Sequence, residues 1–237
     1  EKGLEWLKKA KKSTGLLTSV EVADANHVEL ALKHNVDILW VGARTVVNPF
    51  SVQAIAEALT GVDVPVMIKN PLNPDLKLWL GAIERLNTIG INKLIAVHRG
   101  FHYFEKSPFR NAPMWEIPIE LKRAVRGLPI IVDPSHICGN RDLLESISQK
   151  ALDLEMDGLM IESHHNPDAA LTDSAQQISP QDLKELLENL VIRNRKGDFD
   201  FQHKLEGLRT EIDKLDGELL QILSKRMEII DEIGEYK

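Results

Sequence analysis

The chain has 237 residues, 43% of them hydrophobic, and a formal net charge of −7. This size allows one large α/β domain with an appended segment, and the acidic balance argues against a nucleic-acid or membrane-surface binder, since both need a basic face. The single cysteine excludes an intrachain disulfide framework and is typical of a reducing compartment, so we expect a cytoplasmic protein.

Six apolar runs rich in β-branched residues alternate with amphipathic segments. The strand-like runs lie at 16–22, 37–43, 64–69, 93–99, 129–136 and 157–163, and the helix-like segments at 51–59, 76–90, 115–125, 141–154 and 182–190. Apolar strands that alternate with helices indicate an α/β fold with a parallel sheet. The pattern suits a (β/α)8 barrel or a doubly wound sheet, and the lack of a Gly-x-Gly-x-x-Gly after a strand disfavours the dinucleotide-binding version.

The pattern changes after residue 190. Residues 191–202 are charged, contain a glycine and indicate a linker. From about His203 apolar residues recur at helical spacing and predict one long helix over 203–237, whose apolar face needs a partner. We therefore divide the chain into a domain over 1–190, a linker and a C-terminal helix. Because both chain ends fall inside amphipathic segments, we expect a protein truncated at both ends.

Charged or reactive side chains stand at or just beyond the ends of successive predicted strands. They are Arg44, Lys69, Arg99, His136 and Glu162, with Asp173 farther along the chain. One such residue alone is typical of a solvated loop. In a parallel barrel, however, all strands end at one rim, so we expect these side chains to meet in one pocket.

These residues form two chemical sets. Arg44, Lys69 and Arg99 are cations suited to phosphate and carboxylate oxygens, and three of them together imply a multiply charged anion such as a phosphorylated carboxylic acid. The second set, His136, Glu162 and Asp173, offers donors suited to Mn²⁺, Fe²⁺, Co²⁺ or Zn²⁺. An anion cradle beside a metal suggests a Lewis acid that polarises a carbonyl next to a bound phosphate ester.

Several motifs resemble those of a known enzyme family. They are GAR (42–44) with Asn48, IKN (68–70), HRG (98–100), the loop RGFHYFEKSPFRN (99–111), DPSH (133–136), MIES (160–163) and LTD (171–173). From about residue 3 to 190 the chain resembles the type I 3-deoxy-D-arabino-heptulosonate-7-phosphate (DAHP) synthases, in particular their β branch. Residues 208–237 resemble the first helix of the all-helical chorismate mutases. The resemblance implies a (β/α)8 TIM barrel with six of its eight strands present, fused to an incomplete mutase.

The resemblance also implies a reaction and a set of residues. The family condenses phosphoenolpyruvate with erythrose 4-phosphate, the first step of the shikimate pathway of aromatic amino acid biosynthesis. Carried over by motif, Ala43, Arg44, Lys69 and Arg99 bind phosphoenolpyruvate, and Lys69 and His136 are catalytic. His136, Glu162 and Asp173 are three metal ligands, with Mn²⁺ favoured over Fe²⁺, Co²⁺ and Zn²⁺. The family's fourth ligand, a cysteine, and its Lys-Pro-Arg-Thr motif have no counterpart here, and we interpret Cys138 as a bystander.

For the C-terminal segment the mutase resemblance implies conversion of chorismate to prephenate. The matching positions are Arg209, Arg226 and Lys237, which we expect on about one helix face. Mutases of this type are intertwined dimers, so we expect a homodimer through these helices. Prephenate or chorismate bound there could act as an allosteric feedback ligand on the synthase.

Two alternatives stay open. The first is 3-deoxy-D-manno-octulosonate-8-phosphate synthase, which uses arabinose 5-phosphate and shares the barrel, the cations and the ligand positions. The second is a non-catalytic regulatory module, since we expect 237 residues without two strands of the barrel to be inactive alone.

Overall fold

The computed structural model describes residues 2–192 and 199–235, and the chain divides into two compact units, Glu1–Ile192 and Arg193–Lys237. The first unit contains one six-stranded sheet in which every strand is parallel to its neighbours. The strands are β1 (Ser19–Val22), β2 (Ile38–Val41), β3 (Val66–Lys69), β4 (Leu94–His98), β5 (Ile130–Val132) and β6 (Gly158–Leu159). Their spatial order equals their chain order, as in a barrel, whereas a doubly wound sheet reverses direction. The expected barrel-type α/β fold is confirmed.

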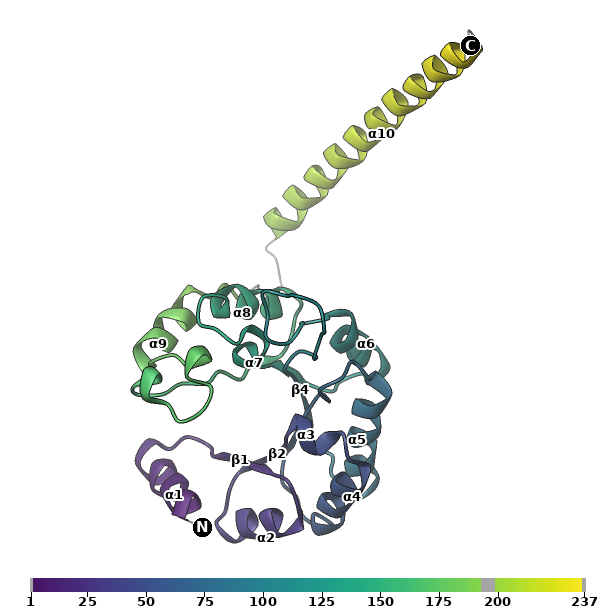
Figure 1. The fold of residues 1–237 in the computed structure, drawn as a ribbon. Coiled ribbons are helices and arrows are strands. Elements are labelled where there is room, and N and C mark those ends of the chain that lie inside the picture. The colour runs from purple at the N-terminus through teal and green to yellow at the C-terminus, as the bar shows by residue number, and fades with distance from the viewer. Residues whose placement is uncertain (1, 193–198, 236–237) are drawn as a thin grey trace. The chain divides into compact units, whose positions relative to one another are not determined.

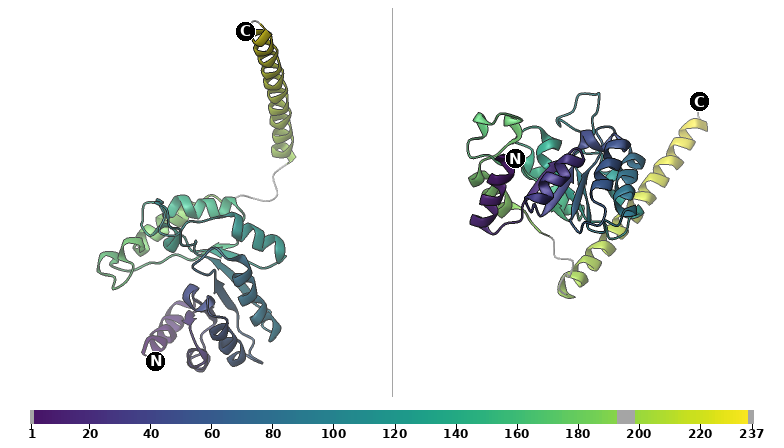
Figure 2. Two further views of the ribbon diagram at one scale, coloured as in Figure 1. Left: turned by 45° about the vertical axis from the view of Figure 1, so that its right-hand side comes forward. Right: turned by 90° about the horizontal axis from the view of Figure 1, so that it is seen from below.

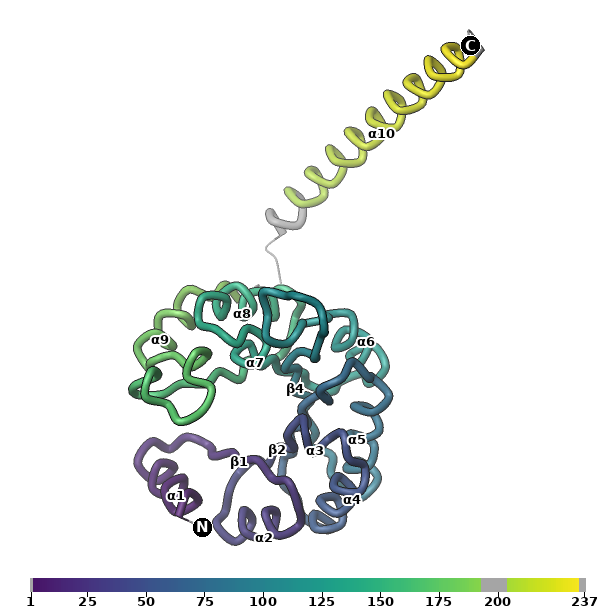
Figure 3. Tube along the Cα trace, in the orientation of Figure 1, coloured from purple at the N-terminus to yellow at the C-terminus, as the bar shows by residue number. Residues whose placement is uncertain are grey.

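Helices connect consecutive strands and surround the sheet. They are α1 (Lys2–Thr14), α2 (Ala25–Lys33), α3 (Ala43–Val46), α4 (Pro49–Ala58), α5 (Leu76–Thr88), α6 (Glu116–Ala124), α7 (Pro134–Cys138), α8 (Leu144–Asp153) and α9 (Pro180–Asn189), with two 3-10 turns, η1 (Pro167–Ala169) and η2 (Ser174–Gln176). Figure 1 shows the larger helices as an arc outside the strands, with α1 and α9 at its two ends, and Figure 2 gives two further views. The trace in Figure 3 follows the chain around this arc.

Local sequence signals explain where several helices begin. Asp24, Asn48, Asp75 and Ser179 each accept a hydrogen bond from a backbone N–H in the first turn of the helix that follows. This capping satisfies donors that have no partner inside the helix. A proline at the first position of α4 and of α9 favours the same start, because the missing N–H is not needed there.

Three predicted strands end earlier than expected, and short helices follow two of them. The third, predicted over 157–163, is a strand only over Gly158–Leu159, so Glu162 lies in the loop after β6. The predicted strand 129–136 stops at Val132, because Asp133 caps α7 and Pro134, which cannot donate to a sheet, occupies its first turn. The predicted strand 37–43 stops at Val41, and α3 begins at Ala43. Arg44 and His136 therefore lie on short helices at the carboxyl edge of the sheet.

The core lies between the sheet and its helices. Leu39, Ile68 and Trp79 are among its fully buried members, and Trp79 Nε1 donates a hydrogen bond of 3.1 Å to the Ile68 carbonyl oxygen, which fixes α5 against β3. Continuous burial along β3 explains why this strand reads as an unbroken apolar run before Lys69.

The second unit contains α10 (Phe199–Glu235), which begins before His203 and inside the predicted linker 191–202. Its apolar residues from Leu208 to Ile233 are exposed. Within the described ranges, every helix lacks the length or the apolarity required to cross a bilayer.

Candidate functional site

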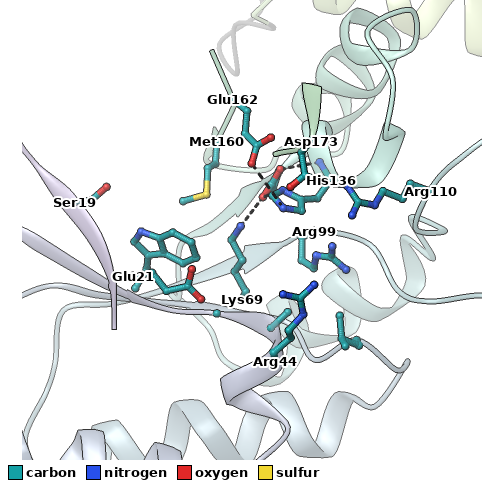
Figure 4. A pocket seen from close by; sticks show the side chains of 15 residues that line it. Ser19, Glu21, Arg44, Lys69, Arg99, Arg110, His136, Met160, Glu162 and Asp173 are labelled. Atoms are coloured by element: carbon teal, nitrogen blue, oxygen red, sulfur yellow. Dashed lines mark hydrogen bonds and ion pairs between the residues drawn. The ribbon is translucent and has the colours of Figure 1, made fainter. Parts of the chain in front are cut away.

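The carboxyl ends of the strands surround a cavity of about 480 Å³. All seven site residues predicted for the barrel line it, namely Ala43, Arg44, Lys69, Arg99, His136, Glu162 and Asp173, together with Glu21, Trp40, Arg110 and Asp133. Figure 4 shows how the basic side chains and the possible metal donors face this space. Residues as distant in the sequence as Glu21 and Asp173, which are 152 positions apart, therefore meet because parallel strands end at one rim.

The cations occupy one part of the cavity. Lys69 ends β3 with only 4% of its surface exposed, and its Nζ lies 4.6 Å from the centre of the Trp40 ring. Arg99 follows β4, is 7% exposed, and donates from Nη1 to Asn111 Oδ1 at 3.0 Å. Burial, followed by the charges of Arg110 and Arg44, lowers the pKa of Arg99, which nevertheless stays protonated at neutral pH.

The possible metal donors occupy the other part. One donor atom from each of His136, Glu162 and Asp173 lies within 4.8 Å of the other two. His136 Nε2 is 3.7 Å from Glu162 Oε1. Asp173 has a left-handed backbone with φ of 51°, which is unusual for a residue other than glycine and directs its carboxylate toward the cluster. The three residues come from α7 and from the loops after β6.

Asp133 joins the two parts, and the sequence analysis gave it no role. It is 1% exposed and accepts hydrogen bonds from Lys69 Nζ at 2.7 Å and from the His136 backbone N–H at 3.0 Å. Its Oδ2 also lies 2.8 Å from His136 Nδ1. Burial alone would raise the pKa of Asp133, but His136 and Lys69 outweigh burial and lower it to about 2. An Asp-Pro pair directly after a strand is a helix N-cap signal that could have identified this residue.

Three further residues that the sequence analysis missed support the carboxylates and the cations. Arg110 Nη1 donates to Asp173 Oδ1 at 2.6 Å and to Gln176 Oε1 at 2.8 Å, and Gln176 Nε2 donates to Glu162 Oε2 at 2.8 Å. The Arg110 guanidinium lowers the pKa of Asp173. Asn111 bonds to Arg99. The loop 99–111 entered the sequence analysis only through its resemblance, and no local pattern indicated these contacts.

Cys138 lies apart from the donors. It is 2% exposed within the hydrophobic core, and burial raises the pKa of its thiol to about 12, so that the thiolate needed for metal ligation is disfavoured. This environment agrees with the interpretation of Cys138 as a bystander.

The proposed mutase residues belong to the second unit of the chain. Arg209 and Arg226 are exposed on α10, and Lys237 lies outside the described residues. The expectation of one common face is wrong for the first pair, because 17 residues correspond to about 4.7 helical turns and place the two side chains about 100° apart around the axis.

The donor set suits a divalent transition metal. One imidazole and two carboxylates are borderline-to-hard ligands. Ligands of this kind suit Mn²⁺, Fe²⁺, Co²⁺ and Zn²⁺. A histidine that ligates a metal through one nitrogen usually donates the other to a carboxylate. Asp133 Oδ2 is the carboxylate oxygen nearest to this role, at 2.8 Å from His136 Nδ1, although the two atoms do not have the geometry of a hydrogen bond. Nε2 then remains for a metal on the side of Glu162.

The comparisons with known proteins agree with this geometry. The DAHP synthetase I family model matches residues 1–195, and the chorismate mutase type II model matches residues 208–237. Phospho-2-dehydro-3-deoxyheptonate aldolase from Thermotoga maritima is 30% identical over 190 residues, covering 80% of this chain and 54% of that protein. 2-dehydro-3-deoxyphosphooctonate aldolase from Agrobacterium fabrum is 27% identical over 191 residues, covering 72% and 57%. The chain thus spans about half the length of these curated relatives.

A solved structure is also similar. A truncated form of 3-deoxy-D-arabino-heptulosonate 7-phosphate synthase from Thermotoga maritima matches with a TM-score of 0.71 and 29% identity, covering 79% of this chain and 69% of that one. The match of the family model across most of the chain, together with this likeness, shows that the chain belongs to the DAHP synthetase I family.

Proposed function

We propose that the protein condenses phosphoenolpyruvate with erythrose 4-phosphate to DAHP and phosphate, with the help of a divalent metal. One observation is the main support: a single cavity at the carboxyl edge of the sheet combines anion-binding cations with a His/Glu/Asp donor cluster. Membership of the DAHP synthetase I family supports the same reaction.

The cations Arg44, Lys69 and Arg99, with the adjacent Ala43, hold the phosphate and carboxylate of phosphoenolpyruvate. Among the described residues, Arg44 and Arg99 form no ion pair with a carboxylate, and Arg99 bonds instead to the neutral amide of Asn111. Their charges are therefore available to a bound anion. Lys69 is oriented by Asp133 and by the Trp40 ring.

The reaction balances with water as the third reactant. Carbon C3 of phosphoenolpyruvate forms a bond to the aldehyde carbon of erythrose 4-phosphate, and the aldehyde oxygen takes up a proton. Water adds to C2, and the bond between C2 and the phosphate oxygen breaks to release phosphate and leave a ketone. His136, Glu162 and Asp173 would hold a divalent ion, which when bound would supply Lewis acidity to a carbonyl group. Lys69 and His136 both contact Asp133 Oδ2. Lys69 fixes phosphoenolpyruvate and exchanges a proton with it, whereas His136 acts in catalysis as a metal ligand.

The C-terminal helix carries the second part of the proposal. The match of residues 208–237 to chorismate mutase type II supports conversion of chorismate to prephenate, with Arg209, Arg226 and Lys237 binding the substrate. The exposed apolar residues of α10 support a dimer through mutase helices, and prephenate or chorismate bound there acts as the feedback ligand. The cytoplasmic location stays a prediction from the single cysteine.

A second sugar substrate also has support. Several curated relatives are 2-dehydro-3-deoxyphosphooctonate aldolases, at up to 29% identity, which keeps arabinose 5-phosphate in competition with erythrose 4-phosphate. The cavity residues named above suit either sugar, because they address phosphoenolpyruvate and the metal.

The test is an activity assay on the full-length protein after chelation and Mn²⁺ add-back. Phosphoenolpyruvate is supplied with erythrose 4-phosphate or with arabinose 5-phosphate, and its consumption is followed. We expect metal-dependent consumption with erythrose 4-phosphate, lost in His136→Ala and retained in His165→Ala, a nearby exposed histidine. Preference for arabinose 5-phosphate supports the sister activity, and no consumption with either sugar leaves a non-catalytic regulatory module.

A further inference from the structure

The loop after β4 returns to the site through a tightly held pair of residues, Arg110 and Asn111. The base of the loop is closed by two backbone hydrogen bonds of 2.8 Å between Phe101 and Ala112. Arg110 N–H donates to the Cys138 carbonyl at 3.2 Å, and Asn111 N–H donates to the Ile137 carbonyl at 3.1 Å. The pair is thus fixed between the end of β4 and α7.

Two glycines allow this close approach. Gly100 has φ of +76°, and a Cβ on it would lie 2.7 Å from the Asn111 carbonyl oxygen. Gly139 has φ of +68°, and its Cβ would lie 2.4 Å from Arg110 Cβ. Both separations are shorter than real Cβ contacts, so the pair is packed on both sides with little room to shift.

The cavity can be divided into an anion subsite, formed by Arg44, Lys69 and Arg99, and a metal subsite, formed by His136, Glu162 and Asp173. The Asn111 side chain connects one residue of each. Its Oδ1 accepts from Arg99 Nη1 at 3.0 Å, and its Nδ2 donates to the His136 carbonyl oxygen at 2.6 Å. The residue is 6% exposed, so water does not readily replace either bond.

The Arg110 side chain reaches the other two donors. It bonds directly to Asp173 at 2.6 Å and, through Gln176, to Glu162, with both connecting bonds at 2.8 Å. In Figure 4, the Arg110 side chain points toward Asp173 and His136. Two consecutive residues therefore contact, directly or through one amide, every proposed metal donor and one proposed phosphoenolpyruvate ligand.

We propose that Arg110 and Asn111 are positioning residues that couple the anion subsite to the metal subsite, so that occupancy of either one strengthens binding at the other. This inference rests on the proposed function, since it requires that the cavity bind both a metal and phosphoenolpyruvate. An anion that draws Arg99 into one position also fixes the backbone of His136 through the Asn111 amide. Coupling of this kind is reciprocal, so metal binding orders Arg99 in the same way.

The experiment measures Mn²⁺ affinity of the full-length protein without and with saturating phosphoenolpyruvate, with no sugar phosphate present and therefore no turnover. Free Mn²⁺ is followed by electron paramagnetic resonance, and the ratio of the two dissociation constants is the coupling ratio. Wild type is compared with Asn111→Leu, which keeps the branching of the side chain at Cγ and removes both hydrogen bonds. Asn111→Ala is the second variant if the leucine protein does not fold by circular dichroism.

Asn70 offers a matched control. It is a fully buried asparagine whose side chain accepts from the Arg99 backbone N–H at 2.7 Å and donates to the Gly100 and Pro71 carbonyls at 2.8 Å. Within the described part of the chain it forms no hydrogen bond to a proposed metal donor. Asn70→Leu therefore removes hydrogen bonds next to Arg99 but none to a proposed metal donor. Electrostatic attraction across the cavity between Mn²⁺ and phosphoenolpyruvate is common to all variants. A difference in coupling ratio between the Asn111 and Asn70 variants therefore reports on the hydrogen bonds of Asn111 to Arg99 and His136.

In wild type we expect a coupling ratio within the usual range of about 5- to 150-fold. In the Asn111 variant it should fall by up to about tenfold, the equivalent of one hydrogen bond to a charged group, toward the ratio that electrostatic attraction alone produces. In Asn70→Leu the ratio should persist even where phosphoenolpyruvate binds more weakly. Independent binding in wild type, an unchanged ratio in a folded Asn111 variant, or an equal fall in the Asn70 control overturns the inference. Wild type that binds neither Mn²⁺ nor phosphoenolpyruvate instead refutes the proposed function.

Discussion

His98 makes the free energy of unfolding depend on pH between about 3 and 6.5. Its ring is fully buried, with centroids 6.5, 5.7 and 5.3 Å from those of Trp79, Phe101 and Trp115. Burial lowers its pKa from 6.5 to about 3. Because the folded pKa is depressed, the unfolded chain binds the proton first. The stability that neutral His98 contributes is thus complete above pH 6.5 and is lost as the pH falls from 6.5 toward 3.

The loss of stability at pH 5 is set by protonation of His98 in the unfolded chain. There the pH is about 1.5 units below the unfolded pKa of 6.5, while folded His98 is still neutral, so protonation favours unfolding by about 2 kcal/mol. His98→Phe keeps an aromatic ring in the same aromatic surroundings and removes the titration. We therefore expect its stability relative to wild type to rise by about 2 kcal/mol between pH 7.5 and pH 5.

The assay is urea-induced unfolding of wild type and variant at both pH values, in the presence of a chelator. The other seven of the eight histidines are common to both proteins and cancel in the difference. His165→Phe, which replaces an exposed histidine, is the control and should show a difference independent of pH. A difference for His98→Phe that is the same at pH 7.5 and pH 5 would refute the assignment of a buried neutral imidazole.

Three more substitutions or treatments test the site's surroundings. Asp133→Asn leaves a buried ammonium without its charge partner, and we expect a loss of about 3–5 kcal/mol in urea unfolding, whereas a loss below about 1 kcal/mol contradicts the buried ion pair. Cys138 should resist a disulfide thiol reagent in the folded protein and react fully in urea, because it is buried with a pKa raised to about 12; rapid native-state modification contradicts this burial. Gly139→Ala should cost more stability than Gly127→Ala in thermal unfolding, by more than about 1 kcal/mol, although both residues have positive φ. The added methyl meets Arg110 at the first position and nothing within 4 Å at the second, so equal costs would show that the close approach is unimportant.

The sequence was sufficient to predict the sheet and the meeting of distant residues. Apolar runs separated by helices predict parallel strands, and the side chains that end such strands converge by geometry. Arg44, Lys69 and Arg99 could be assigned to one cavity for this reason, without knowledge of any contact. The prediction depends only on the direction of the strands, which a repeating pattern determines.

Other features depend on contacts that no periodic pattern records. Asn111 and Arg110 matter because the loop returns between β4 and α7, and a loop's path is set by tertiary packing. The error at His136 was different in kind: the strand prediction ran through Asp133 although the Asp-Pro sequence is a helix-start signal. The loop contacts could not be predicted because they depend on tertiary packing. The Asp-Pro helix start was present in the sequence and was overlooked.

The pairing of charges explains how an acidic protein can hold an anion next to carboxylates. Lys69 is paired with Asp133 and Arg110 with Asp173, so these charges offset each other inside the cavity. Arg44 and Arg99 keep their charge for a ligand, while Glu162 bonds to the neutral amide of Gln176 and keeps its own. A divalent cation beside Glu162 would therefore reduce repulsion of a phosphate as well as polarise a carbonyl. On this reasoning metal and anion binding depend on each other electrostatically, and the Arg110–Asn111 pair adds a structural connection to that dependence.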